Sequence, residues 1–169
     1  MTYYKDPSLT PVEAMTVPDF QLERYLGRWY EMSRDKDTKF QKGDYTTADY
    51  AWNEAKTGIS VTNNEYIDGK MTKEPVVGRG ECNHADRGIC RVAFSRFQPW
   101  GNYWILDTDY DNYAVVYSKV TGFWSNFLDF EFLWVLTRKP LEKRTKEWNR
   151  IKAKAGSVIR KKLPDYDLE

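Results

Sequence analysis

The sequence feature that most constrains the fold is a series of short segments in which apolar and polar residues alternate. Alternation with a period of two is typical of strands that bury one face of a sheet. Turn residues separate the segments, such as the pair Asp68 and Gly69 and the run at 109–111. The predicted strands lie at about 27–35, 44–52, 59–66, 76–82, 90–97, 102–108, 112–118 and 130–138. Eight antiparallel strands in this order predict an all-β, up-and-down barrel, whose lumen is just wide enough for one small ligand.

A helix is predicted after the last strand. Pro140 suits the first turn of a helix, and Gly156 is a typical residue for its end. Between them, apolar residues recur at helical spacing and predict a C-terminal α-helix packed on the outside of the barrel. These residues are Leu141, Trp148, Ile151 and Ala155.

Length and charge limit the alternatives. A chain of 169 residues is expected to form one domain, and we predict an N-terminal arm over 1–20, the barrel and helix over 21–163, and a tail over 164–169. The 26 basic and 25 acidic residues leave a net charge of +1, which does not provide the basic surface that nucleic-acid binding requires. No segment approaches the ~20 apolar residues of a membrane-spanning helix.

The two cysteines, Cys82 and Cys90, lie on either side of a predicted turn. Their spacing is not that of a zinc site, and His84 is the only histidine, so we predict no metal site. Two interpretations stay open: a disulfide across the hairpin, which implies an oxidising compartment, or two reduced, partly buried thiols. The first residues do not have the apolar centre of a signal peptide. We expect a secreted or periplasmic protein whose signal is not present, with a cytoplasmic or membrane-peripheral protein as the alternative.

Three short motifs coincide with the predicted strands. Gly27 and Trp29 form a G-x-W motif at the start of the first strand, a T-D-Y motif lies at 108–110, and an R-x-P motif begins at Arg138. In this order the motifs resemble those of the lipocalin family, over about residues 19–163. The leading sequence L-E-R-Y-L-G-R-W-Y-E is most similar to the group of apolipoprotein D, the plant temperature-induced lipocalins and the bacterial lipocalins.

The resemblance assigns structural roles to the motif residues. It implies that Trp29 lies at the closed end of the barrel, under the guanidinium of Arg138, where a cation can pack on the indole face. The other structural positions are Gly27, Thr108, Asp109 and Tyr110. The family also implies a barrel that keeps a cavity.

Alternation separates lumen-facing from outward-facing residues once Trp29 and Arg138 are taken as inward. The inward set combines aromatic rings, small residues and a few polar groups, which is the composition of an apolar ligand pocket. Arg96 and Tyr103 are expected toward the open end, where they would meet a carboxylate or head group. The alternative is that the rings fill the barrel and that Arg96 faces solvent. The predicted ligand-binding residues are Ala48, Tyr50, Trp52, Val61, Val76, Phe94, Arg96, Tyr103, Ile105, Val116, Phe132 and Trp134.

The loop at 122–128 carries an apolar cluster at the expected mouth of the barrel. Exposed apolar patches often mark contact sites. Three roles stay open: a lid over the cavity, a peripheral membrane contact, or a dimer contact, so we expect a monomer or a weak dimer. The large apolar residues of the loop are Phe123, Trp124, Phe127 and Leu128.

These observations predict a protein that binds and carries or sequesters a small hydrophobic ligand: a fatty acid, lysophospholipid, sterol or retinoid. A coloured tetrapyrrole or carotenoid is the close alternative, because the resemblance extends to proteins that bind such molecules. Catalysis is not expected, since acid–base chemistry needs a histidine or a perturbed carboxylate near the substrate, and no inward histidine is predicted. A lipocalin enzyme, which a free and reactive Cys82 or Cys90 would favour, and a filled barrel that recognises another protein are the remaining alternatives. No cofactor is expected.

Overall fold

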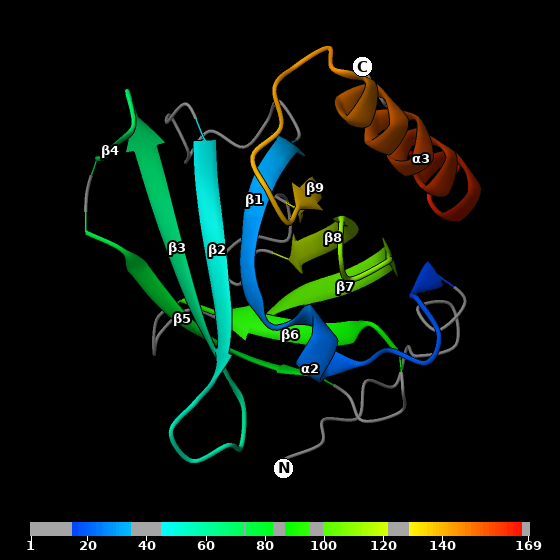
Figure 1. Ribbon diagram of the computed structural model, residues 1–169. Coiled ribbons are helices and arrows are strands. Elements are labelled where there is room, and N and C mark those ends of the chain that lie inside the picture. The colour runs from blue at the N-terminus through cyan, green and yellow to red at the C-terminus, as the bar shows by residue number, and fades with distance from the viewer. Residues whose placement is uncertain are drawn as a thin grey trace.

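The fold is a β-barrel with one long helix beside it (Figure 1). The computed structural model describes residues 15–34, 45–72, 74–82, 87–94, 100–121 and 129–166. The strands are β1 (Gly27–Arg34), β2 (Tyr45–Trp52), β3 (Ile59–Ile67), β4 (Lys70–Met71), β5 (Val76–Cys82), β6 (Ile89–Ala93), β7 (Gly101–Thr108), β8 (Tyr113–Thr121) and β9 (Asp129–Thr137). The helices are α2 (Leu22–Tyr25) and α3 (Lys146–Lys162).

Hydrogen bonding closes the sheet into a barrel. The strand order is β2-β1-β9-β8-β7-β6-β5-β3-β4, and a further pairing of β2 with β3 completes the circle. Every neighbouring pair is antiparallel. The eight strands other than β4 form the wall, which confirms the predicted barrel. Closure removes the unpaired edges along which other chains could add.

Strand β4 is an addition that alternation did not predict. It is a two-residue strand, Lys70–Met71, that pairs with the end of β3. The residues between the two strands, Asp68 and Gly69, have φ values of 50° and 71°. Two successive positive φ values are what a type I′ hairpin turn requires, and Asp-Gly is favoured there for that reason. The turn signal was present in the sequence, but a strand this short is not visible as alternation.

Two apolar cores lie on opposite sides of the barrel wall. The inner core includes Trp29, Tyr50, Val116 and Leu136. The outer core lies between the barrel and helix α3, which contacts β7 and β8, and it includes Val135 (Figure 1). The neighbours Val135 and Leu136 thus face opposite sides, as period-two alternation requires. The predicted packing of a C-terminal helix on the outside of the barrel is confirmed.

Helix α3 begins later than predicted. Its N-cap is Thr145, whose Oγ1 accepts a hydrogen bond from the backbone N–H of Trp148 at 3.2 Å. This bond satisfies one of the N–H groups that the first turn of a helix leaves unpaired. Pro140 and Leu141, which we expected inside the helix, lie in the connection that precedes it. The proline marks the end of the sheet, and the threonine determines where the helix starts.

Helix α3 also continues past Gly156, where we expected it to end. It runs to Lys162, and Val158 and Ile159 beyond the glycine are only 7% and 3% exposed. A glycine inside a helix costs about 1 kcal/mol relative to alanine, whereas burial of an aliphatic side chain contributes about 1.5–3 kcal/mol. The outer core therefore outweighs the glycine. Within the described residues, no helix is long and apolar enough to span a membrane.

The closed end of the barrel is held by Trp29 and Arg138. The Arg138 guanidinium lies 3.8 Å from the centroid of a Trp29 ring, and Trp29 is 0% exposed. The indole Nε1 donates a hydrogen bond to the Tyr25 carbonyl at 2.8 Å. The guanidinium also donates hydrogen bonds to the backbone carbonyls of Arg24, Tyr25, Arg28 and Tyr110. One arginine thus connects the chain before β1, the start of β1 and the turn after β7.

The turn between β7 and β8 is organised by Thr108 and Asp109. The Asp109 carboxylate accepts hydrogen bonds from the backbone N–H groups of Asn112 at 2.8 Å and Tyr113 at 3.0 Å, and from Asn112 Nδ2 at 2.8 Å. Thr108 Oγ1 accepts a hydrogen bond from the Tyr110 N–H at 2.9 Å. Burial acts to raise the pKa of Asp109, but the hydrogen bonds outweigh it and hold this pKa below its usual value.

Replacing Asp109 with asparagine is expected to lower the free energy of unfolding by about 1 kcal/mol at neutral pH, because hydrogen bonds to a charged acceptor are stronger. Since folding lowers the pKa of Asp109, its contribution is complete above the unfolded value of about 3.9 and is lost as the pH falls through the folded value. The difference between variant and wild type should therefore shrink below about pH 4.

Urea unfolding at neutral and acidic pH measures this difference. Asp165→Asn, at an exposed residue after α3, is the control and should match wild type at both pH values. A difference for Asp109→Asn that does not change with pH would contradict the role of the charge.

Candidate functional site

The inner face of the barrel carries most of the residues that we predicted to bind ligand. The register pairs Tyr50 with Val61, so the two share this face. Val76 is 41% exposed near the open end of β5, and Arg96 lies outside the described residues. The predicted residues buried in the inner core are Tyr50, Val61, Tyr103, Ile105 and Val116. Those partly buried against this core are Ala48, Trp52, Phe94 and Trp134.

Phe132 and Trp134 form the inner surface of strand β9. Their rings are stacked, with centroids 5.5 Å apart and an interplanar angle of 18°. Trp134 pairs with Val116 of the inner core, so these rings face the lumen. Both stay partly exposed, whereas the outward neighbours Leu133 and Val135 are 7% and 6% exposed. Phe132 and Trp134 therefore lie on the less buried of the two faces of β9, although they point into the barrel.

Phe94 has its place inside the barrel because residue 78 is a glycine. A Cβ atom added at Gly78 would lie 2.7 Å from the Phe94 ring, closer than Cβ contacts come in proteins. The absence of a side chain on β5 thus lets the ring lie against the strand. Alternation predicted that Phe94 faces inward, but not that Gly78 makes room for its ring.

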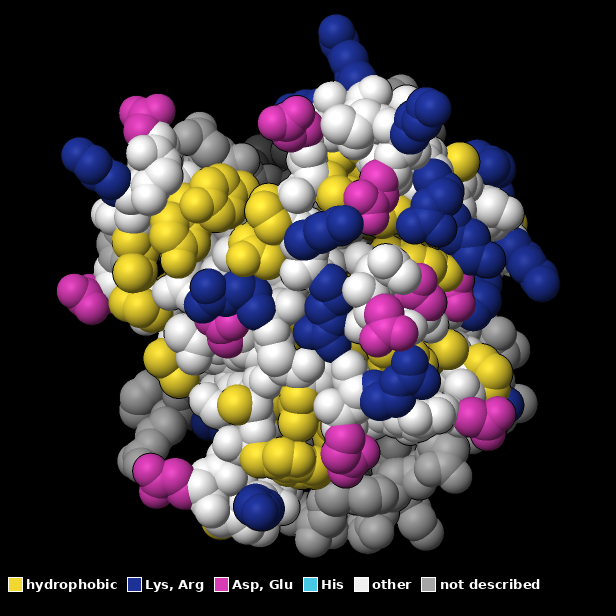
Figure 2. Space-filling model, in the orientation of Figure 1, with side chains coloured by type: hydrophobic (Ala, Val, Ile, Leu, Met, Phe, Trp, Pro, Cys, Tyr) yellow, Lys and Arg dark blue, Asp and Glu magenta, His cyan; other side chains and the backbone are white. Residues whose placement is uncertain are grey.

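The described rim at the open end carries an apolar patch among charged residues such as Asp68, Lys70 and Glu74. Figure 2 shows hydrophobic side chains gathered over the ends of β2 and β3, near β4. Tyr45 and Tyr66 stack with ring centroids 4.8 Å apart. The large apolar side chains exposed there are Tyr45, Ile67, Met71, Val76 and Val77. By the parity of the strands, Tyr45, Tyr66 and Val77 of this patch lie on the outward face of the wall.

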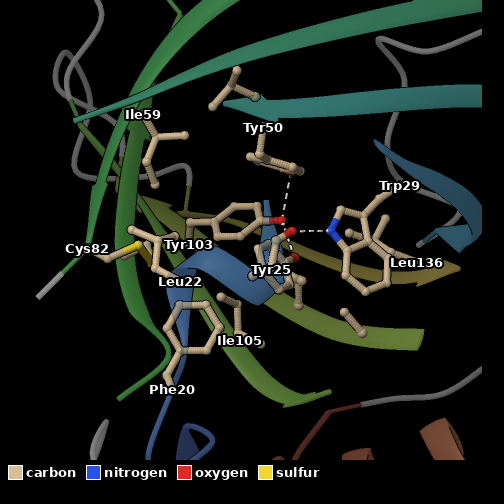
Figure 3. Close-up of a cluster of buried hydrophobic side chains, with 14 of the residues drawn as sticks. Phe20, Leu22, Tyr25, Trp29, Tyr50, Ile59, Cys82, Tyr103, Ile105 and Leu136 are labelled. Carbon is tan, nitrogen blue, oxygen red and sulfur yellow. Dashed lines mark hydrogen bonds between the residues drawn. A yellow bond between two sulfur atoms is a disulfide. The ribbon is translucent and has the colours of Figure 1, made fainter. Parts of the chain in front are cut away.

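A narrow pocket lies at the closed end of the barrel. Figure 3 shows several of the side chains that line it. Leu22 and Tyr25 of helix α2 form one side, and Ile59 and Cys82 contribute apolar surface from β3 and β5. Sequence reasoning missed helix α2 and its residues. The signal was present, because Leu22, Tyr25 and Leu26 follow the i, i+3, i+4 spacing of an apolar helical face.

Cys82 and Cys90 form a disulfide across the β5–β6 hairpin. They are cross-strand partners, 5% and 3% exposed, and both line the narrow pocket. Directly opposed residues in an antiparallel pair have Cβ atoms close enough for a disulfide. Of the two interpretations that the sequence left open, the disulfide is correct. Neither sulfur is a free thiol that could act as a nucleophile.

Three buried tyrosine hydroxyls meet inside the barrel, and we name Tyr25, Tyr50 and Tyr103 the tyrosine triad (Figure 3). The Tyr103 hydroxyl oxygen lies 2.9 Å from that of Tyr25 and 2.7 Å from that of Tyr50. Burial raises the pKa of Tyr50 to about 12 and raises those of Tyr25 and Tyr103 well above the usual value. All three phenols are therefore protonated and uncharged at neutral pH.

The prediction that Tyr103 lies toward the open end is wrong. Its strand pairs it with Cys90 near the closed end, and its hydroxyl meets that of Tyr25, which precedes the G-x-W motif. Alternation predicts the face that a residue occupies, but its height in the barrel depends on the tilt and stagger of the strands. Tyr103 therefore lies deep in the barrel, away from the mouth.

A carboxylate also faces the lumen. Glu31 pairs with Leu136 of the inner core and accepts a hydrogen bond from the Thr46 hydroxyl. After burial, its negative charge is a further cause of the raised pKa of Tyr50. The inner wall therefore has a polar side, with Glu31 and Thr46 close to the tyrosine triad.

Several predicted features lie outside the described residues. They include His84 and the loop at 122–128, so the roles of that loop as lid, membrane contact or dimer contact stay predictions. Among the residues that the structure does describe, there is no group of three or more histidine, cysteine, aspartate or glutamate side chains suited to a metal ion.

Two relatives match most of the chain in sequence. It is 40% identical to apolipoprotein D of Mus musculus over 124 residues, which covers 72% of this chain and 62% of that protein. It is 34% identical to the outer membrane lipoprotein Blc of Vibrio cholerae over 137 residues, which covers 79% of this chain and 74% of that protein. The chain thus spans less than two thirds of the length of the mouse relative.

Fold comparison and a family model agree with these relatives. The structure is similar to insecticyanin from the tobacco hornworm Manduca sexta, with a TM-score of 0.61, 27% sequence identity, and coverage of 86% of this chain and 78% of that one. The family model for the lipocalin-like domain matches residues 20–163. The motifs, the closed barrel with its outer helix and this match all lead to one conclusion: the chain belongs to the lipocalin family.

Proposed function

We propose that this protein binds a small hydrophobic ligand in the lumen of its barrel and carries or sequesters it. The observation that carries the proposal is the stacked pair Phe132 and Trp134, inward rings that stay partly exposed although the closed end of the barrel is packed. An apolar ligand against these rings would remove apolar surface of both from water, which is the main favourable term in such binding.

The ligand class that fits is a long or flat apolar molecule with a small polar group. Fatty acids, lysophospholipids, sterols and retinoids share this character, and an apolar lumen distinguishes them weakly, since one methylene changes the transfer free energy by only about 0.8 kcal/mol. The similarity to an apolipoprotein supports a role with lipid-like molecules.

An oxidising compartment, outside the cell or in the periplasm, fits the protein best. The disulfide between Cys82 and Cys90 supports this location, because such bonds persist in oxidising surroundings and are rare in the cytosol. The similarity to an outer membrane lipoprotein is in keeping with it.

A binding protein is favoured over an enzyme. The feature that would have favoured catalysis was a free, reactive thiol, and both cysteines are buried in the disulfide instead. The carboxylate of Glu31 faces the lumen, but it accepts a hydrogen bond from Thr46, as a structural group does.

The proposal is tested by titrating delipidated protein with a fatty acid, a lysophospholipid, a sterol, a retinoid and a bilin while tryptophan fluorescence is recorded. We expect saturable quenching with at least one class. Trp134→Ala should weaken that affinity about tenfold to hundredfold, because the ligand loses a large buried contact. Trp148→Ala, on helix α3 outside the barrel, is the matched control and should keep the wild-type affinity.

If none of the five ligand classes gives saturable quenching, the proposal is refuted. Equal losses in Trp134→Ala and Trp148→Ala would place the ligand outside the lumen, and this also contradicts the proposal.

A further inference from the structure

The tyrosine triad has one more hydrogen-bond donor than it uses. Each protonated phenol carries one O–H donor, so Tyr25, Tyr50 and Tyr103 together carry three. Two hydrogen bonds join the hydroxyls, and each uses one donor. Whichever way these two bonds point, one O–H group has no acceptor among the residues that the structure describes.

Because the triad is buried, leaving this donor without an acceptor costs free energy. The three side chains are 2%, 7% and 8% exposed, so bulk water does not surround their hydroxyls. A buried donor without an acceptor carries the full cost of its lost hydration, and an oxygen atom that accepts its hydrogen bond removes that cost. An oxygen atom that reaches these hydroxyls would therefore be held by the spare donor.

We propose that the tyrosine triad donates a hydrogen bond to a neutral oxygen atom, of a hydroxyl or carbonyl group, at the leading end of the ligand. This inference rests on the proposed function, because it requires a ligand inside the barrel. It adds an orientation: the oxygen-bearing end lies deep in the barrel, and the apolar body lies along Phe132 and Trp134 toward the mouth.

The charge near the triad favours a neutral oxygen over a carboxylate. Glu31 lies on the same inner wall, and its charge acts on the Tyr50 hydroxyl. The Arg138 guanidinium acts on Tyr25 in the opposite sense, but it packs on Trp29 and donates hydrogen bonds to four backbone carbonyls. A negative charge that disfavours ionisation of a phenol also repels a second anion at that place. An alcohol or ketone avoids this repulsion, so the site fits such molecules better than a fatty acid that enters carboxylate first.

The test uses two ligands of equal length that differ in one carbonyl group, methyl decyl ketone and dodecane. Their affinities are measured in the wild type and in the triple variant Tyr25→Phe, Tyr50→Phe, Tyr103→Phe. All three hydroxyls must be removed together, because any smaller set leaves at least one donor in excess. Phenylalanine keeps the ring, and replacing all hydrogen-bond partners together with apolar groups of the same shape is close to neutral for stability.

We expect the preference for the ketone, expressed as the ratio of the two Kd values, to fall about two- to tenfold in the triple variant, the size of one net hydrogen bond. The ratio cancels the effect of the variant on binding of the shared apolar body. The matched control is Tyr45→Phe, Tyr66→Phe, a stacked pair at the opposite end of β2 and β3, which should keep the wild-type ratio.

The outcomes separate the two proposals. If both ligands bind and the ratio is the same in wild type and triple variant, the hydrogen-bond inference is wrong while the proposed function stands. If neither ligand binds to the wild type, the hydrogen-bond inference fails, and the fluorescence titration decides the proposed function separately.

An infrared measurement on wild-type protein does not depend on the folding of the variant. A carbonyl that accepts a hydrogen bond absorbs at a lower frequency than the same carbonyl in an alkane. We expect the bound ketone to show this lower frequency, and a carbonyl band at its position in dodecane solution would overturn the inference.

Discussion

Replacing Trp29 with alanine is expected to lower the free energy of unfolding by about 3–5 kcal/mol. The side chain is 0% exposed, and its removal leaves a cavity at the closed end that the surrounding strands cannot collapse to fill. The Tyr25 carbonyl also loses the indole N–H, and the Arg138 guanidinium loses the ring on which it packs. Since a domain is stable by only about 5–15 kcal/mol, a large share of the total would be lost.

Urea unfolding followed by circular dichroism measures this loss. Trp29→Phe should have an intermediate effect, because a ring remains under the guanidinium while the N–H bond and part of the buried area are lost. Trp148→Ala, a partly buried tryptophan on helix α3, is the matched control and should cost clearly less. Equal losses for Trp29→Ala and Trp148→Ala would show that the contacts of Trp29 with Arg138 and Tyr25 do not stabilise the closed end.

Removing the disulfide with the double variant Cys82→Ala, Cys90→Ala is expected to lower the free energy of unfolding by about 2–4 kcal/mol. The bond joins residues eight positions apart, and opening it returns conformational entropy to the unfolded chain. Because the two residues are 5% and 3% exposed and line the pocket at the closed end, the lost sulfur atoms also leave unfilled space there.

A reducing agent provides the internal control for this prediction. Dithiothreitol should lower the unfolding midpoint of the wild type toward that of the double variant and should leave the double variant unchanged. If fully reduced wild-type protein, verified by mass spectrometry, keeps the midpoint of the oxidised form, the disulfide does not stabilise the barrel.

Local patterns in the sequence were sufficient to predict the eight strands that form the wall of the barrel. Alternation depends on the pleat, which sends successive side chains to opposite faces whatever surrounds the strand, so Val135 and Leu136 could be assigned to opposite sides in advance. The ends of helix α3 could not be assigned in this way. Gly156 disfavours the helix only slightly. The free energy gained by burying Ile159 against the barrel is larger, and it depends on the tertiary structure.

The candidate site also has features that the sequence predicts and features that only the tertiary structure shows. The sequence by itself determined which side chains of the barrel face inward, because face depends on residue parity along a strand. Only the tertiary structure decided that Tyr103 lies deep in the barrel and that it meets Tyr25 and Tyr50, which come from other elements. Such meetings depend on strand tilt, stagger and the position of helix α2, which are set by how the whole barrel closes and not by any local pattern.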